Sequence, residues 1–99
     1  MRRAQVMRMI WIDAYIEAGE FLLRRQHLRL AFDISIPQAS ADLAMFQGLF
    51  PGRIAYDKSE KGYRAAEGSR QAFEDHEHSA VFLACSFAAD AQRRLEAQA

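Results

Sequence analysis

The amino-acid sequence predicts an α+β fold that is mostly helical, with one short β-hairpin among the helices. Apolar residues recur at the spacing of an α-helix over several stretches of the chain. Proline and glycine mark the ends of these stretches, and a polar turn near residue 60 separates two short runs that are typical of strands. The chain has 99 residues, 51% of them hydrophobic, which is enough for the core of one small domain.

The first two helices are expected over residues 3–18 and 24–32. The apolar side chains of the first helix lie mostly on one side, and Gly19 follows where a helix end favours a positive φ. Residues 20–23 are expected to form a single short strand or an extended segment. In the second helix, Leu28, Ala31 and Phe32 are expected to face inward and the arginines to face outward.

A third helix is expected to follow Ser35 and to run to about Phe50. Ser35 fits an N-cap, Gln38 three residues later can complete a capping box, and Pro37 falls in the first turn. The two opposite faces of this helix differ in the kind of side chain they present. One face has small or polar residues and no long charged side chain, which favours close approach to another molecule. The other face is apolar and consists of Ala39, Leu43, Phe46 and Phe50.

Only residues 33–35 separate the second and third helices, which predicts a helix-turn-helix. Residues 53–56 and 63–66 are then expected to form two strands, joined by the polar turn at residues 57–62. A hairpin that directly follows such a helix pair is a wing. The order of elements therefore predicts a winged helix-turn-helix over residues 1–68.

Residues 69–99 are expected to form a connector and a C-terminal helix. Residues 71–78 are a connector or the start of a helix, and the chain is expected to be helical from about Ser79, a possible N-cap, to Ala97. The helix is apolar around much of its circumference, which is a wider stripe than a helix lying on a small domain needs. We therefore expect this helix to be a dimerisation element, through which the chain forms a homodimer.

The chain has no formal net charge, but its charges are unevenly distributed. Up to Arg64 it has 10 basic and 7 acidic residues, whereas the remainder has 3 basic and 6 acidic residues. This asymmetry favours contact between a polyanion and the first part of the chain.

Two motifs resemble a known family. Residues 38–43, Gln-Ala-Ser-Ala-Asp-Leu, and residues 51–63, which end in Tyr-Asp-Lys-Ser-Glu-Lys-Gly-Tyr, are similar to the N-terminal winged helix-turn-helix of WYL-domain transcription regulators. The closest branch is the BrxR-like and CapW-like repressors of bacterial anti-phage defence systems, and the resemblance extends over residues 3–63.

The resemblance implies a dimeric repressor that binds double-stranded DNA sequence-specifically, often at its own operon. A dimer of this kind is expected to bind an inverted-repeat operator. Family members continue into a WYL sensor domain, so we expect residues 1–99 to be a truncated module or a small stand-alone regulator without ligand sensing of its own. As a DNA-binding protein it is expected in the bacterial cytoplasm, on the nucleoid when bound.

The second helix of a helix-turn-helix presents its N-terminal residues to base edges in the major groove. We therefore expect Gln38, Ser40 and Ala41 to lie nearest the bases. Glutamine can bind adenine through two hydrogen bonds, and an alanine methyl can pack on the methyl group of thymine. The alternative for Gln38 is that it only closes the capping box. Asp42 is expected to be structural, because phosphates repel a carboxylate.

The wing supplies the candidate phosphate contacts. Lys58, Ser59 and Lys61 are expected to meet phosphates or the minor groove. Two further groups leave alternatives open. Arg24 and Arg25 are expected either to contact the DNA backbone or to be solvated. Tyr63 is expected either to donate a hydrogen bond to a phosphate or to pack under the hairpin. For Tyr56, packing under the hairpin is the favoured interpretation.

No pattern in the sequence indicates an enzyme, a cofactor or a metal site. His76 and His78 are two residues apart, which is the wrong spacing for one helix face, and Cys85 is the single cysteine and is interpreted as a small buried hydrophobe. No apolar run is long enough to cross a membrane, so we expect no membrane partner.

Two other functions stay open. The first is a winged-helix protein–protein adaptor that does not bind DNA, which the zero net charge favours. The second is an anti-repressor that pairs with a full-length relative through the C-terminal helix.

Overall fold

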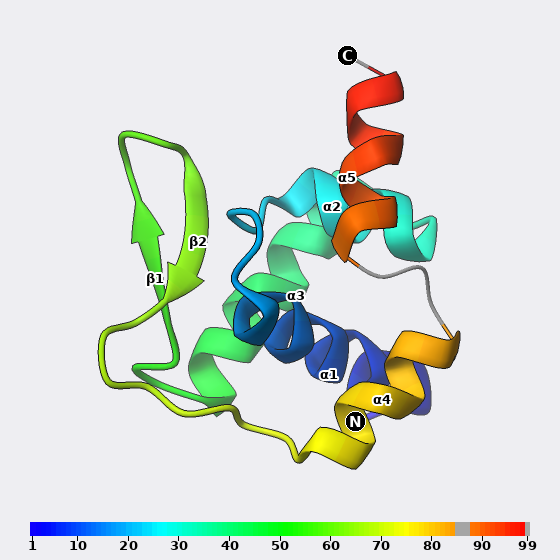
Figure 1. Ribbon diagram of the computed structural model, residues 1–99. Coiled ribbons are helices and arrows are strands. Elements are labelled where there is room, and N and C mark those ends of the chain that lie inside the picture. The colour runs from blue at the N-terminus through cyan, green and yellow to red at the C-terminus, as the bar shows by residue number, and fades with distance from the viewer. Residues whose placement is uncertain (85–87, 99) are drawn as a thin grey trace.

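The computed structural model describes residues 1–84 and 88–98, and the side chains of residues 1–81 and 91–98. Within these residues the chain forms α1 (Arg3–Ala18), α2 (Arg25–Phe32), α3 (Ile36–Leu49), β1 (Ile54–Asp57), β2 (Gly62–Ala65), α4 (Asp75–Ala84) and α5 (Ala88–Ala97) (Figure 1). The mostly helical α+β class is confirmed, and so is the order of three helices followed by a hairpin.

Helix α1 forms the centre of the core. It packs against α2, α3, α4 and β2. Four of its side chains are at most 2% exposed, those of Met9, Trp11, Ile12 and Tyr15. The neighbouring elements therefore cover this helix along much of its length. Its predicted bounds are confirmed, and Gly19 ends it with φ of 65°, a left-handed conformation that glycine adopts without a steric penalty.

Helices α2 and α3 pack against each other across a short turn, as a helix-turn-helix requires. Ser35 Oγ accepts a hydrogen bond from Gln38 N at 3.2 Å, so the predicted N-cap is confirmed. The capping box is not completed as predicted, because the Gln38 side-chain amide donates to Asp42 Oδ1 at 2.9 Å. The predicted apolar face is confirmed, with Ala39, Leu43 and Phe46 buried.

Strands β1 and β2 pair antiparallel, each one residue away from its predicted bounds, with Tyr56 opposite Tyr63. Leu23 adds a third, single-residue pairing, since its N donates to Tyr63 O at 2.9 Å and its O accepts from Tyr63 N at 2.8 Å. The predicted short extended segment before α2 is therefore confirmed at Leu23. Gly62 allows this close approach, because a Cβ there would lie 2.7 Å from Leu22 Cβ.

The C-terminal part contains two helices where the sequence predicts one. Helix α4 begins at Asp75, inside the run expected to be a connector or the start of a helix, so the second alternative is correct there and the possible N-cap at Ser79 is wrong. The physical reason is local, because Glu77 Oε2 accepts a hydrogen bond from Glu74 N at 2.8 Å and stabilises an earlier first turn.

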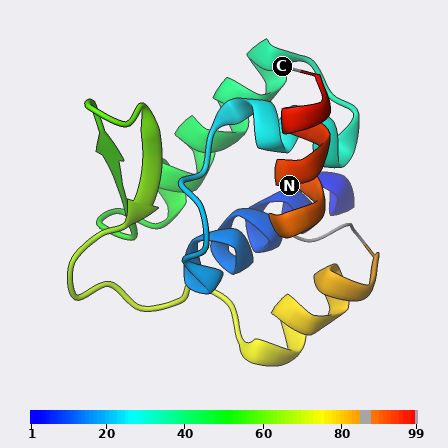
Figure 2. The same cartoon turned by 45° about the horizontal axis from the view of Figure 1, so that its top comes forward.

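Helix α4 packs on α1, and α5 packs on α2 (Figure 2). Val81 and Ala91 are buried in these contacts. Part of the apolar surface of the C-terminal segment therefore belongs to the core of the same chain. Cys85, expected to be a buried hydrophobe, lies outside the described residues. Dimerisation through this segment and a boundary after residue 68 stay predictions.

Within the described part of the chain, no helix has the length and apolar character needed to cross a bilayer.

Candidate nucleic-acid interface

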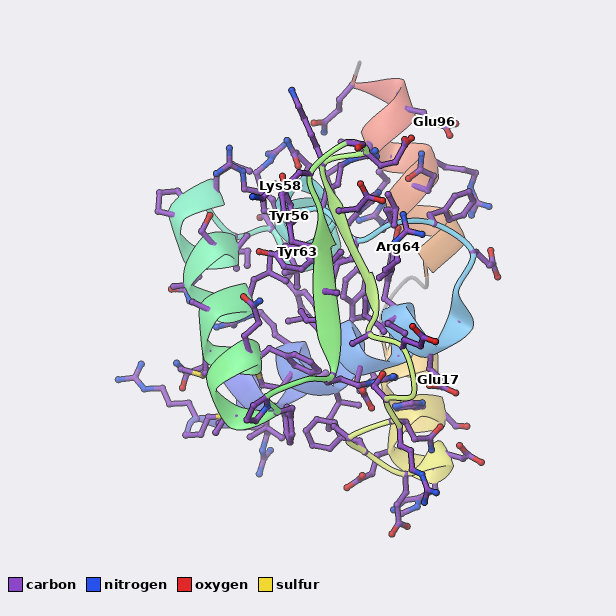
Figure 3. All side chains as sticks on the ribbon, turned by 90° about the vertical axis from the view of Figure 1, so that its left-hand side faces the viewer. Glu17, Tyr56, Lys58, Tyr63, Arg64 and Glu96 are labelled. Carbon is purple, nitrogen blue, oxygen red and sulfur yellow. The ribbon has the colours of Figure 1, made fainter. Side chains whose placement is uncertain are left out.

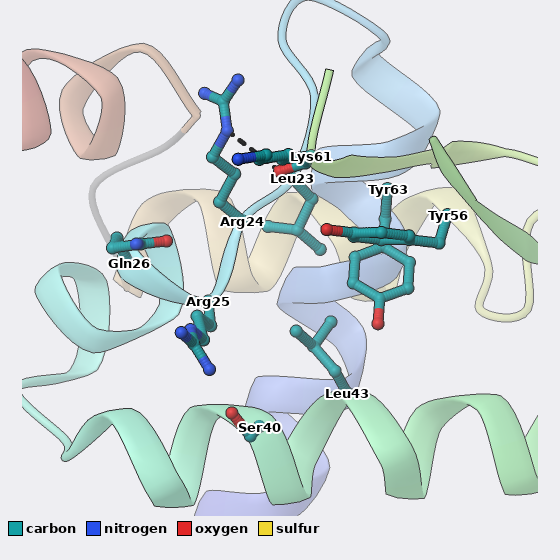
Figure 4. A pocket seen from close by; sticks show the side chains of 9 residues that line it. All are labelled: Leu23, Arg24, Arg25, Gln26, Ser40, Leu43, Tyr56, Lys61 and Tyr63. Carbon is teal, nitrogen blue, oxygen red and sulfur yellow. Dashed lines mark hydrogen bonds between the residues drawn. The ribbon is translucent and has the colours of Figure 1, made fainter. Parts of the chain in front are cut away.

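One side of the molecule combines the helix-turn-helix with the wing. A pocket of about 480 Å³ lies between the start of α2, helix α3 and the hairpin (Figure 4). We call it the interface pocket. Its lining includes five of the predicted DNA-binding residues, Arg24, Arg25, Ser40, Lys61 and Tyr63, together with Leu23, Gln26, Leu43 and Tyr56. The fold therefore brings together residues that lie as many as 40 positions apart in the sequence.

The remaining predicted residues lie outside the lining of this pocket. Gln38 and Ala41 are in the first half of α3, where Ala41 is exposed and Gln38 is half-buried. Lys58 and Ser59 are exposed in the turn of the hairpin. The structure thus places the two predicted groups on separate elements that flank the interface pocket.

Helix α3 has an almost neutral surface. Its single charged residue is Asp42, whose side chain is 1% exposed. Arg8 of α1 donates from Nε to Asp42 Oδ2 at 2.6 Å, so Asp42 has the structural role that the sequence predicts. The outer face of α3 is left with short side chains at Pro37, Ala41, Ala44 and Gly48, all of them exposed.

Arg24 has a role that neither interpretation of the sequence included. Its Nε donates to Lys61 O at 3.2 Å and its Nη2 donates to Glu60 O at 3.1 Å. The guanidinium therefore holds the turn of the wing against the start of α2. The positive charge stays at the surface next to Lys61, whereas Arg25 is exposed and lines the interface pocket.

The turn of the wing is ordered by Asp57. Its Oδ1 accepts hydrogen bonds from Ser59 N at 2.9 Å and from Glu60 N at 3.0 Å, and its Oδ2 pairs with Arg64. The bond from Glu60 N and the charge of Arg64 lower the pKa of Asp57. Lys61 closes the turn with φ of 56°. The side chain of Lys58 is therefore presented from an ordered loop (Figure 3).

Tyr56 and Tyr63 project from the same face of the hairpin toward α3 (Figures 3 and 4). Their ring centroids are 5.0 Å apart in an edge-to-face arrangement. Tyr56 is 50% exposed, so the expectation that it packs under the hairpin is wrong. On the same face of the hairpin, Ile54 is buried in the core and Tyr63 packs against the core, whereas Tyr56 lines the interface pocket.

A buried ion-pair network fixes the base of the wing, and sequence reasoning missed it. Asp13 of α1 is fully buried and accepts from Arg53 Nε at 2.7 Å and His78 Nε2 at 2.8 Å. It also accepts from Ala72 N and Phe73 N, at 2.8 and 2.9 Å. Burial alone would raise the pKa of Asp13, but these hydrogen bonds outweigh it and lower the pKa.

Arg53 extends the network to the exposed side. Its Nη2 donates to Glu17 Oε1 at 2.8 Å and its Nη1 donates to Ser69 Oγ at 3.1 Å. The residue before β1, the connector after β2 and helix α4 are thereby tied to α1. The sequence signal that could have found this network is an acidic residue, Asp13, inside the apolar run of the first helix.

His27 connects α2 to α5. It is fully buried, its Nδ1 accepts from Arg24 N at 2.9 Å, and its Nε2 lies 2.6 Å from Gln92 Oε1. The Gln92 oxygen can only accept, so Nε2 carries the hydrogen and the imidazole is neutral. Burial lowers the pKa of His27, which agrees with this neutral form.

In the described residues, no group of three His, Cys, Asp or Glu side chains is arranged to hold a metal ion.

A family model described as the winged helix-turn-helix domain of the BrxR transcriptional regulator matches residues 4–85. The matched range contains the helix-turn-helix, the hairpin and α4. A search of curated proteins found no match to the chain.

Proposed function

The chain belongs to the winged helix-turn-helix family of the BrxR transcriptional regulator, and on this basis we propose that it is a dimeric repressor that binds an inverted-repeat operator in double-stranded DNA. Within this proposal it acts in the bacterial cytoplasm and controls an operon of anti-phage defence. The observation that carries the proposal is the placement of a neutral, small-residue helix beside a wing with exposed lysines.

Helix α3 supplies the base contacts. The exposed residues of its outer face, Pro37, Ala41, Ala44 and Gly48, are short, so its backbone can approach the floor of the major groove closely. Gln38, Ser40 and Ala41 lie in its first half, the part of a recognition helix that reaches base edges. Because α3 has no exposed charge, affinity for the phosphates has to come from neighbouring elements.

The wing and the start of α2 supply the phosphate contacts. Lys58 and Lys61 extend from the ordered turn, with Ser59 between them, and Arg25 faces the interface pocket. Tyr63 lines the same pocket, where its hydroxyl can donate to a phosphate oxygen. These groups form a positive rim on a molecule that has no net charge.

The dimensions of the molecule support a dimer on one face of DNA. The chain measures 32 × 32 × 24 Å. Copies of this size can lie side by side along the duplex with their α3 helices about 34 Å apart, which is about one turn of B-DNA. Two α3 helices can thus enter successive major grooves on the same side of the duplex.

The second candidate function is a winged-helix adaptor that binds protein and not DNA. The zero net charge and the absence of Lys and Arg from α3 favour it. The two functions differ in DNA binding, because an adaptor does not bind a DNA duplex at moderate salt.

The test is a fluorescence-anisotropy titration of the chain against DNA from upstream of its own gene, with a scrambled duplex as the control. It is done at about 50 and about 200 mM salt, because each neutralised phosphate steepens the salt dependence. Tight, salt-sensitive binding to the upstream duplex alone is expected. A folded protein that binds neither duplex would favour the adaptor.

A further inference from the structure

A buried series of side-chain hydrogen bonds connects α1 to the proposed base-reading residue of α3. Arg8 donates to Asp42 twice, from Nε to Oδ2 at 2.6 Å and from Nη2 to Oδ1 at 3.3 Å. Gln38 Nε2 donates to the same Oδ1 at 2.9 Å. The Arg8 and Asp42 side chains are 11% and 1% exposed, so water competes little for the two bonds between them, and the bond from Gln38 is partly buried.

The carboxylate decides which end of the Gln38 amide faces inward. An ionised carboxylate only accepts hydrogen bonds, so the nitrogen of Gln38 has to face Asp42 and the oxygen has to face away. Arg8 holds the carboxylate through two bonds, one to each oxygen. A glutamine on an open helix surface has no such restriction and rotates freely.

We propose that Arg8 and Asp42 are positioning residues that fix the Gln38 amide for recognition of adenine. Gln38 donates to Asp42 the amide hydrogen that points away from its own Oε1. The second hydrogen and Oε1 then form one donor–acceptor edge, which matches N7 and the N6 amino group of adenine. Prior ordering also removes the entropy cost of immobilising the side chain on binding.

This inference rests on the proposed DNA-binding function, and it adds a specificity role to two residues that do not touch DNA. An ion pair that only joined α1 to α3 would affect the stability of the fold and leave base preference unchanged. Base preference is therefore the quantity to measure.

The experiment selects duplexes from a randomised library with the full chain and counts the four bases at each enriched position. We compare the wild type with Gln38→Ala and with the double variant Arg8→Met/Asp42→Leu. The double variant removes the acceptor for Gln38 without leaving a buried charge unpaired. Gln47→Ala is the matched control, because Gln47 is an exposed glutamine of the same helix.

The wild type is expected to enrich adenine at one position of each half-site. Gln38→Ala and the double variant are each expected to reduce that preference about 10-fold, the order of magnitude of one bidentate contact. The triple variant with all three substitutions should show no further loss of adenine preference, since Gln38→Ala and the double variant act on the same amide. Gln47→Ala and all other positions should be unaffected.

A folded double variant that keeps the full adenine preference overturns the inference, and so does a preference that survives Gln38→Ala. A wild type that enriches no sequence overturns the proposed function itself. If the double variant does not fold, NMR of the wild-type chain decides. The Gln38 side-chain amide should be more rigid and exchange its hydrogens more slowly than that of Gln47, and equal mobility of the two would overturn the inference.

Discussion

Two buried arginine–aspartate pairs join helix α1 to different parts of this small molecule. Asp13 accepts four hydrogen bonds, including one from Arg53, and joins α1 to the connector and to α4. Asp42 joins α3 to Arg8 of α1. A buried charge is tolerated only where opposite charge and hydrogen bonds replace its lost hydration. Both carboxylates meet this condition, so the removal of either one leaves an arginine without its buried counter-charge.

The first residue-scale prediction is that Asp13→Ala is severely destabilising. The substitution leaves Arg53, His78 and two backbone N–H groups without their acceptor. We expect a loss of about 3–5 kcal/mol in the free energy of unfolding, against a total of about 5–15 kcal/mol for a domain of this size. Urea denaturation of the variant and the wild type measures it. A loss below about 1 kcal/mol would contradict the role given to this network.

The lowered pKa of Asp13 also predicts the direction of acid denaturation. The unfolded carboxyl titrates near its ordinary value of 3.8, and the folded one titrates below it. The stabilisation is therefore complete above pH 3.8 and is lost as the pH falls through the folded pKa. Asp13→Asn should flatten this part of the stability profile, whereas substitution of the exposed Asp75 by Asn should not.

At the wing, Lys58→Ala/Lys61→Ala should weaken binding to all DNA sequences. Each lysine that contacts a phosphate releases about one counterion, so the slope of log K against log salt should fall by about 2 for each bound copy, which is about 4 for a dimer. Arg70→Ala is the control, because Arg70 is exposed in the connector, away from the turn of the wing. An unchanged slope would show that these lysines do not contact the DNA.

At the scale of elements, α2 connects the C-terminal helix with the wing. His27 accepts from the N-terminal backbone of α2 and bonds to Gln92 of α5, and Arg24 holds the turn of the wing. Arg94 of α5 donates to Leu30 O of α2, and Arg29 of α2 donates to Gln98 Oε1, directly after the end of α5. The wing is therefore supported both by its own turn and by the packing of α5 on α2.

His27 predicts a dependence of stability on pH. Its unfolded pKa is near the ordinary value of 6.5, and its folded pKa is lower. The unfolded state thus binds more protons between these two values. The contribution of neutral His27 is complete above pH 6.5 and decreases as the pH falls toward the folded pKa. Thermal unfolding between about pH 5 and about pH 8 measures this dependence.

Substitution of His27 by Gln should remove this dependence, because glutamine can accept from Arg24 N and does not titrate. His76→Gln is the matched control, since His76 is exposed at the start of α4. A pH profile that persists in H27Q would assign the effect to another group.

At the scale of the whole molecule, a neutral protein has to concentrate its positive charge to bind DNA. The exposed lysines of the wing, Arg24 and Arg25 lie on one side, around the interface pocket. The acidic residues after position 65 belong largely to the connector, α4 and α5. A dimer would double the positive rim and allow each copy to contribute one α3.

The dimer proposal makes a geometric prediction. Insertion of about 5 base pairs between the half-sites turns the second half-site to the opposite face of the duplex, whereas insertion of about 10 restores the face. The first change should reduce affinity more than 10-fold and the second should partly restore it. Anisotropy titrations of the three duplexes measure this, and equal affinities would indicate that a single copy is the binding unit.

The sequence by itself determined the class of the fold and the order of its elements. Residues 3–18, the cap at Ser35 and the polar turn of the wing are local patterns, and each was predicted to within one or two residues. The resemblance to BrxR-like regulators was confirmed by the family model over residues 4–85. Local hydrogen bonding and amphipathic periodicity are encoded within a few neighbouring residues, so they can be read along the chain.

Only the tertiary structure decided which side chains meet. The Asp13–Arg53 pair joins residues 40 positions apart, and the contacts of Arg24 with the wing span 36 and 37 positions. No local pattern specifies such partners, because they depend on how α1, α2 and the hairpin pack in three dimensions. The exposure of Tyr56 and the pairing of Gln38 with Asp42 follow from the same packing, which also sets the direction of each side chain at the interface.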